Sequence, residues 1–199
     1  KIRFEGNGYG DEWVKAAEKR GLSNLRDTPR ALQVWGDKKV EELFNEMGVL
    51  SPRELEARQE IEFESYVYKL QIEARVMGEM AQNTIIPAVV EYQNTLIANI
   101  QGLFNVLGDK MGKEASDAQI ELLKRISVHM NKMKDSCDLM LTARKKANNI
   151  EDMEKKAVAY CDTVKIYFDE IRYHADKLEI LIDDKVWPLP KFSEMLFTR

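Results

Sequence analysis

Apolar residues recur every three or four positions along most of this chain, which is the pattern of amphipathic helices. The longest helical run begins at a capping box formed by Ser51 and Glu54, with Pro52 at the first helical position, and continues to about Leu107. A single helix of roughly 55 residues would be about 80 Å long. We therefore expect a spine on which the other elements pack. Pro87 lacks a backbone donor and clashes with the preceding turn, so we expect a kink there that separates a lower arm from an upper arm.

Two further segments predict long helices. A turn over Gly108–Gly112 is expected to end the spine, and Ser116 to cap a helix that runs to about Ala147. The last helix extends from about Glu151 to Asp184. Spacings of three and four residues give both helices a seam of the coiled-coil type, at Leu123, Ile126, Met130, Met133, Cys137 and Met140, and at Met153, Ala157, Tyr160, Val164, Tyr167, Ile171, His174, Leu178 and Leu181.

Short connections between these helices force neighbours to run antiparallel. The pattern therefore predicts an all-α fold in which a long kinked helix contributes to an antiparallel three-helix bundle, accompanied by a small N-terminal group of short helices. We divide the chain into residues 1–50, a linker, a turn and short helices that pack on the spine, and residues 51–199, the bundle with its C-terminal tail.

The N-terminal part begins with a glycine-rich turn, Gly6–Gly10, followed by a short helix that Asp11 is expected to cap and Gly21 to end. The turn has neither the Gly-Lys-Ser/Thr of a phosphate loop nor GxGxxG spacing, so we interpret it as a plain turn. Further short helices are expected to start near Thr28 and Asp37. Apolar residues at helical spacing predict a small satellite core on the lower arm, formed by Trp13, Leu22, Leu25, Leu32, Trp35, Val40, Leu43 and Phe44.

The C-terminal segment contains two prolines, Pro188 and Pro190, that end the last helix and impose extended backbone. A final amphipathic turn follows, and its apolar side chains must dock on this chain or on a neighbour. The candidate interface residues are Trp187, Phe192, Met195, Leu196 and Phe197.

Composition narrows the function classes. A net charge of −4, with acidic and basic residues alternating along helices, argues against a nucleic-acid-binding protein, which needs a concentrated basic face. No segment reaches 18 consecutive apolar residues and no signal-peptide pattern is present, so we expect a cytoplasmic protein with no membrane partner. The first residue is Lys1 rather than methionine, which suggests a piece of a larger protein.

Candidate chemistry is sparse. Neither His129 nor His174 belongs to the Glu-x-x-His motif of di-iron bundles, and neither cysteine shows zinc-ligand spacing. We interpret His174 as a core histidine with a hydrogen-bonded partner and His129 as a surface or edge residue. Cys137 and Cys161 are expected to be buried free thiols, with a disulfide or a redox pair as the alternatives. We predict no catalytic, cofactor-binding or metal-binding residue in this segment.

Five stretches of the sequence match a known family, and they are Phe4–Leu22, Asn24–Leu32, Gly48–Met77, Ile85–Asn94 and Ile171–Phe197. Together they resemble the C-terminal region of type III glutamine synthetase. The resemblance spans nearly the whole chain, and it is weakest from about Gly102 to Tyr160. The order and spacing of these stretches, rather than any single motif, make the resemblance specific.

The resemblance implies an enzyme that condenses L-glutamate with ammonia in an ATP-dependent reaction, uses Mg or Mn, and assembles into stacked hexameric rings. Its catalytic motifs would lie in an upstream catalytic domain before Lys1, and none of them has a match here. The resemblance thus implies a helical extension that braces the catalytic domain or the subunit contacts of a homo-oligomer. One alternative is a stand-alone helical protein-interaction module, and another is a fragment that retains activity.

Overall fold

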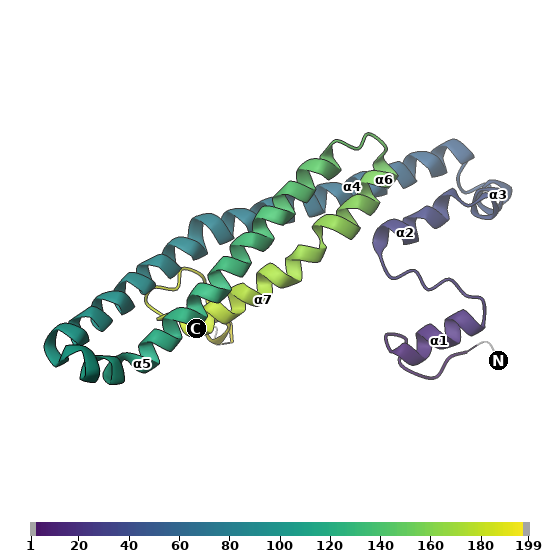
Figure 1. The fold of residues 1–199 in the computed structure, drawn as a ribbon. Helices are drawn as coiled ribbons and strands as arrows, with labels where there is room; N and C mark the ends of the chain where they lie inside the picture. The colour runs from purple at the N-terminus through teal and green to yellow at the C-terminus, as the bar shows by residue number, and fades with distance from the viewer. Residues whose placement is uncertain (1–2, 197–199) are drawn as a thin grey trace.

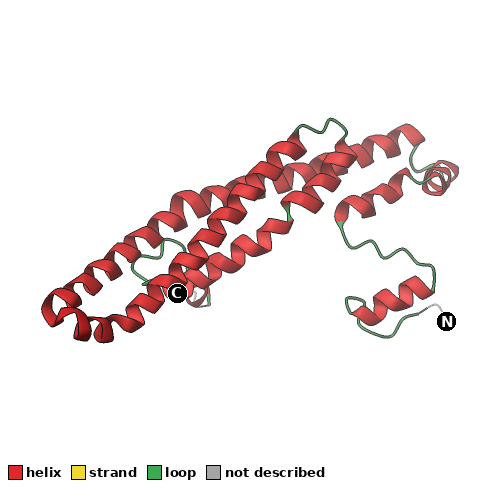
Figure 2. Cartoon of the chain, in the orientation of Figure 1, coloured by secondary structure: helices red, strands yellow, loops and turns green. Residues whose placement is uncertain are grey.

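A computed structural model of the chain describes residues 3–196, which form helices and loops with no strand in that range (Figures 1 and 2). The predicted all-α fold is confirmed. In chain order the α-helices are α1 (Asp11–Lys19), α2 (Thr28–Gln33), α3 (Lys38–Glu46), α4 (Pro52–Met80), α5 (Ile86–Asn148), α6 (Met153–Ala159), α7 (Ile166–Leu181) and α8 (Phe192–Met195). Three segments of different pitch lie between them: the 3₁₀ turn η1 (Val34–Gly36) and the π-helical η2 (Ala81–Ile85) and η3 (Tyr160–Val164).

The spine starts at the predicted capping box. The Ser51 hydroxyl accepts a hydrogen bond from the Glu54 N–H at 3.4 Å, and the Glu54 carboxylate accepts one from the Ser51 N–H at 2.8 Å. The predicted irregularity at Pro87 takes the form of the π segment η2 just before it, where the Ile86 N–H donates to the Ala81 carbonyl. Widening the helix here relieves the clash between the proline ring and the preceding turn.

The chain reverses at Gly108, whose φ of 72° lies in the left-handed region that glycine adopts without a steric penalty (Figure 1). The turn predicted over Gly108–Gly112 is therefore confirmed in position but is shorter than predicted, because helical backbone resumes directly after Gly108. Ser116 does not cap a helix; it is buried inside α5, and its hydroxyl donates to the Lys113 carbonyl at 3.4 Å. The two arms of α5, which are its parts before and after Gly108, approach closely at Gly112. A Cβ added at Gly112 would lie 2.8 Å from Phe104 Cα.

The bundle core lies between the spine, the returning arm of α5 and the helix that runs from α6 through η3 to α7. The two predicted seams are confirmed as core positions, because most of their residues are buried. The fully or nearly buried members are Ile126, Met133, Cys137 and Met140 on α5, and Ala157, Tyr160, Val164, Ile171, His174 and Leu178 on the last helix. Burial raises the pKa of the Cys137 thiol to about 11, so this cysteine is a packing residue rather than a nucleophile.

The short helices α2 and α3 pack on the start of α4, as predicted. The Gln59 side chain fixes this contact by donating to the Leu32 carbonyl at 2.8 Å. The predicted satellite core is only partly present, because Leu22, Leu25 and Leu43 are exposed. Leu22 and Leu25 lie between α1 and α2, in an extended segment that separates α1 from the bundle (Figure 1). Leu43 is an exposed residue of α3.

The glycine-rich turn is a plain turn, as interpreted from its sequence. The Gly10 N–H donates to the Asn7 carbonyl at 3.0 Å, and Gly10 rather than the predicted Asp11 is the N-cap residue of α1. Trp13 of α1 packs against Phe4, with ring centroids 5.1 Å apart. The first helix therefore forms a small unit with the turn that precedes it.

Candidate functional site

The candidate functional site of this chain is a contact surface on its exterior. Within residues 3–196, no group of three or more His, Cys, Asp or Glu side chains is placed to hold a metal ion. Among the helices of the same range, none is long and apolar enough to cross a membrane. The candidate site is therefore made of exposed apolar and charged side chains.

The five predicted interface residues separate into two groups. Trp187 is buried and belongs to the bundle core, so its apolar surface docks on this chain. Phe192 begins the short helix α8, and Met195 and Leu196 are exposed. Phe197 lies outside the described residues. Among the described side chains of the tail, Met195 and Leu196 are therefore the apolar ones available to another surface.

Lys191 fixes the point at which the tail leaves the bundle. Its ammonium group donates to the Glu179 carbonyl at 2.9 Å and pairs with the Asp184 carboxylate. The lysine side chain is mostly buried, with a relative exposure of 15%. Carbonyl groups at the C-terminal end of a helix lack intrahelical partners, so this lysine caps α7 from a distant position in the sequence. The sequence analysis missed this contact because no local pattern marks it.

An apolar groove runs between α4 and α7, next to the tail. Its volume is about 570 Å³, and charged residues such as Glu73, Arg172 and Asp176 lie beside it. Residues of α4, η2 and α7 form most of its wall, and Leu189, Pro190 and Met195 of the tail complete it. The apolar residues that line the groove include Ile72, Val76, Met80, Ile171, Ala175 and Met195.

Apolar side chains also follow the exposed side of α4, and we call them the α4 face. The spacings between them are seven, four, four and four residues, so they lie on one side of the helix. Large exposed apolar patches are typical of interaction sites, so this row of side chains is a candidate contact surface. The α4 face consists of Ile61, Tyr68, Ile72, Val76 and Met80, with relative exposures of 57%, 53%, 62%, 47% and 39%.

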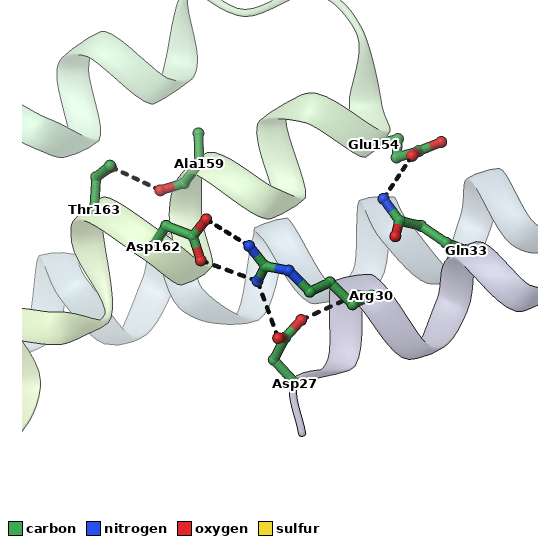
Figure 3. Close-up of polar contacts among 7 residues, drawn as sticks. All are labelled: Asp27, Arg30, Gln33, Glu154, Ala159, Asp162 and Thr163. Carbon is green, nitrogen blue, oxygen red and sulfur yellow. Dashed lines mark hydrogen bonds and ion pairs between the residues drawn. The ribbon is translucent and has the colours of Figure 1, made fainter. Parts of the chain in front are cut away.

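A polar contact joins the N-terminal helices to the last helix (Figure 3). The Arg30 guanidinium on α2 donates to both carboxylate oxygens of Asp162 on η3, at 3.1 and 2.8 Å, and to Asp27 at 2.9 Å. Nearby, the Gln33 amide donates to the Glu154 carboxylate at 2.8 Å. The Arg30 hydrogen bonds hold the pKa of the Asp162 carboxyl below its ordinary value. This bidentate contact positions α2 relative to the bundle.

Replacing Arg30 with lysine should loosen the N-terminal helices without unfolding the bundle. Lysine keeps the charge and loses the bidentate geometry. Because the pair is exposed, we expect cleavage in the segment 22–26 to become about two- to fivefold faster in limited proteolysis. The matched control is Arg172→Lys, which alters an ion pair with Asp176 inside one helix. Equal cleavage rates for the two variants would contradict this role for Arg30.

The histidines and cysteines lie partly where the sequence places them. His174 is buried in the core, as predicted, and its hydrogen-bonding partner is His129, which is partly buried, as expected for an edge residue. Cys137 and Cys161 are both free thiols, but Cys161 is only partly buried. The histidine pairing has no signal in the sequence, because 45 positions separate the two residues.

The sequence of this chain is similar to those of known proteins from one family. Residues 1–103 match the family described as the glutamine synthetase C-terminal domain. The chain is 41% identical over 198 residues to a glutamine synthetase of Bacteroides fragilis strain YCH46, and 31% identical over 199 residues to a type-3 glutamine synthetase of Dictyostelium discoideum. A glutamine synthetase of Butyrivibrio fibrisolvens is 32% identical over 199 residues. Each alignment covers 100% of this chain but only 27%, 27% and 28% of the respective relatives, so the chain spans little more than a quarter of their length.

Proposed function

Because this chain belongs to the glutamine synthetase family, as the C-terminal helical region of a type III member, we propose that it braces the catalytic domain or the subunit contacts of that enzyme. The whole protein would catalyse ATP-dependent condensation of L-glutamate with ammonia to give L-glutamine. It would act in the cytoplasm as a homo-oligomer. The alignments over the full length of this chain support the assignment, and the bracing role is our inference from its surface.

The α4 face carries the proposal. A helix that serves only its own bundle exposes polar residues on its outer side, whereas α4 exposes five large apolar side chains there. Burying this face against another domain or subunit removes that apolar area from water, which favours association. The groove between α4 and α7 continues the same surface towards the tail, where Met195 and Leu196 are exposed.

Residues 3–196 present no set of side chains that fits the ATP and the Mg or Mn that the parent enzyme would require. Metal-assisted phosphoryl transfer needs clustered carboxylates and free cationic side chains. The described part of the chain brings no three metal-binding side chains together. Arg30 is already engaged by two carboxylates. We therefore assign ATP and metal to the upstream catalytic domain and derive no catalytic step from this segment.

A lysine in the α4 face should weaken assembly of the whole protein. Val76→Lys places a charge in the proposed contact, and we expect association about tenfold weaker or more. Val90→Lys is the matched control, because Val90 is exposed to a similar extent, 41% against 47% for Val76, and lies on α5. Light scattering after gel filtration measures assembly, and glutamine formation measures activity. Unchanged assembly and activity in Val76→Lys would exclude the α4 face from bracing.

A truncation tests the tail separately. A whole protein that ends after Lys191 keeps Trp187 in the core and the cap on α7, and it lacks residues 192–199. Full assembly and activity in this truncation would remove Phe192, Met195, Leu196 and Phe197 from the proposed interface. We expect partial loss of assembly instead.

The alternative is a stand-alone helical interaction module, which the continuous bundle core of the described residues favours. The two proposals differ in the mass of the native polypeptide. A mass well above 23.1 kDa in source cells supports an upstream catalytic domain, whereas a mass near 23.1 kDa supports the module.

A further inference from the structure

The only two histidines of the sequence contact each other in the fold. Nδ1 of His129 on α5 lies 2.9 Å from Nδ1 of His174 on α7. The His174 ring is 5% exposed, and the Tyr173 ring stands edge-on to both imidazoles. The pair therefore forms a polar joint between two helices whose remaining contacts are largely apolar.

The contact between the two Nδ1 atoms limits the number of protons that the histidine pair can hold. In the neutral pair, one Nδ1–H donates to the other Nδ1, which acts as the acceptor. A first added proton leaves this bond intact, since one imidazolium can still donate to one neutral imidazole. A second added proton makes both Nδ1 atoms donors, and two donors cannot remain in contact at 2.9 Å. The doubly protonated pair must separate.

The surroundings also oppose protonation of the pair. Burial lowers the pKa of both imidazoles, and neighbouring cations lower it further. The carboxylate of Glu170 acts in the opposite direction on His174. The same cations disfavour a divalent metal ion between the two rings. The charged and titratable groups that face the pair come from the same two helices and are Arg125 and Lys132 on α5, and Glu170, Tyr173 and Lys177 on α7.

We propose that the His129–His174 pair is an acid-sensitive clasp that holds α7 against α5 and opens on acidification. Lys191 ties the tail to the C-terminal end of α7, so opening of the clasp also loosens the tail beside the groove. The clasp is a property of this chain and does not rest on the enzymatic assignment. Its functional consequence is a helix pair whose contact reports the pH of its compartment.

The pH dependence has a definite sign. Both pKa values are lowered in the folded chain relative to the unfolded value of about 6.5. The unfolded chain consequently binds more protons below that pH. The stabilisation from the pair is complete above about pH 6.5 and is lost as the pH falls through the folded pKa values.

The test combines NMR titration with urea unfolding of the 199-residue chain between pH 5.5 and 7.5. Because the sequence has only two histidines, every imidazole resonance belongs to the pair. We expect both imidazoles to titrate below pH 6.5, and the unfolding equilibrium constant to rise about tenfold per pH unit for each proton taken up. The double variant His129→Gln/His174→Gln keeps polar side chains and should lose this dependence.

Hydrogen exchange localises the opening and needs no variant. After correction for intrinsic rates, amides of α7 should exchange faster at pH 5.5 than at pH 7.5, while those of α4 change little. Titration of the imidazoles at or above pH 6.5, or equal pH dependence in the double variant, would overturn the proposal. Binding of one equivalent of zinc at pH 7.5, with both imidazole resonances shifted, would overturn it in favour of a metal site.

Discussion

Replacing Gly112 with leucine is expected to lower the free energy of unfolding of this chain by about 3 kcal/mol or more. Gly112 is buried where the two arms of α5 meet after the reversal at Gly108. A Cβ atom here would lie 2.8 Å from Phe104 Cα and 3.2 Å from Phe104 N. These are backbone atoms, so the contact cannot be relieved by a side-chain rotation. One arm must move, and the packing behind it moves with it.

The matched control is Gly102→Leu in the same helix. No atom lies within 4 Å of a Cβ built at Gly102, and leucine is a better helix former than glycine, so this variant should gain about 0.5–1 kcal/mol. Urea denaturation followed by circular dichroism measures both. If the two leucine variants had equal stability, the close approach of the arms at Gly112 would be disproved.

The parts of the fold that local chemistry determines could be predicted from the sequence. The start of the spine at Ser51 depends on a capping box of neighbouring residues, and it lies where expected. The seams depend on a 3.5-residue period, and Met133 and Met140 are buried accordingly. The reversal was only partly predictable. Two glycines suggested a turn of several residues, yet Gly108 alone has positive φ and Gly112 serves close packing.

The candidate site was less predictable because exposure depends on distant partners. Trp187 was a candidate interface residue because it lies beside two prolines, but its side chain is buried in the bundle core. Ile72 and Val76 carry no mark in the sequence that separates them from core residues, and only the position of α7 leaves them exposed. His129 and His174 are joined by packing of helices far apart in sequence. Each of these contacts is set by tertiary structure and has no local signal.

Replacing Tyr160 with alanine is expected to lower the free energy of unfolding by about 3–5 kcal/mol. Tyr160 is fully buried in η3, and its hydroxyl donates to the Asn148 side-chain carbonyl at 2.5 Å. Gln71 of α4 donates to the same oxygen at 3.0 Å, so one residue at the end of α5 connects three elements. Alanine removes the ring, leaves a cavity between these helices and deprives Asn148 of one donor.

Two further variants separate packing from hydrogen bonding. Tyr160→Phe keeps the ring and loses only the hydroxyl, so it should cost about 1 kcal/mol. Tyr68→Ala is the control for loss of a tyrosine ring, because Tyr68 is exposed on α4 and should change stability by less than about 0.5 kcal/mol in the isolated chain. Urea denaturation provides all three values. If Tyr160→Ala lost no more stability than Tyr68→Ala, Tyr160 would not hold α4, α5 and the last helix together. If Tyr160→Phe lost as much stability as Tyr160→Ala, the hydrogen bond rather than the ring would hold these helices together.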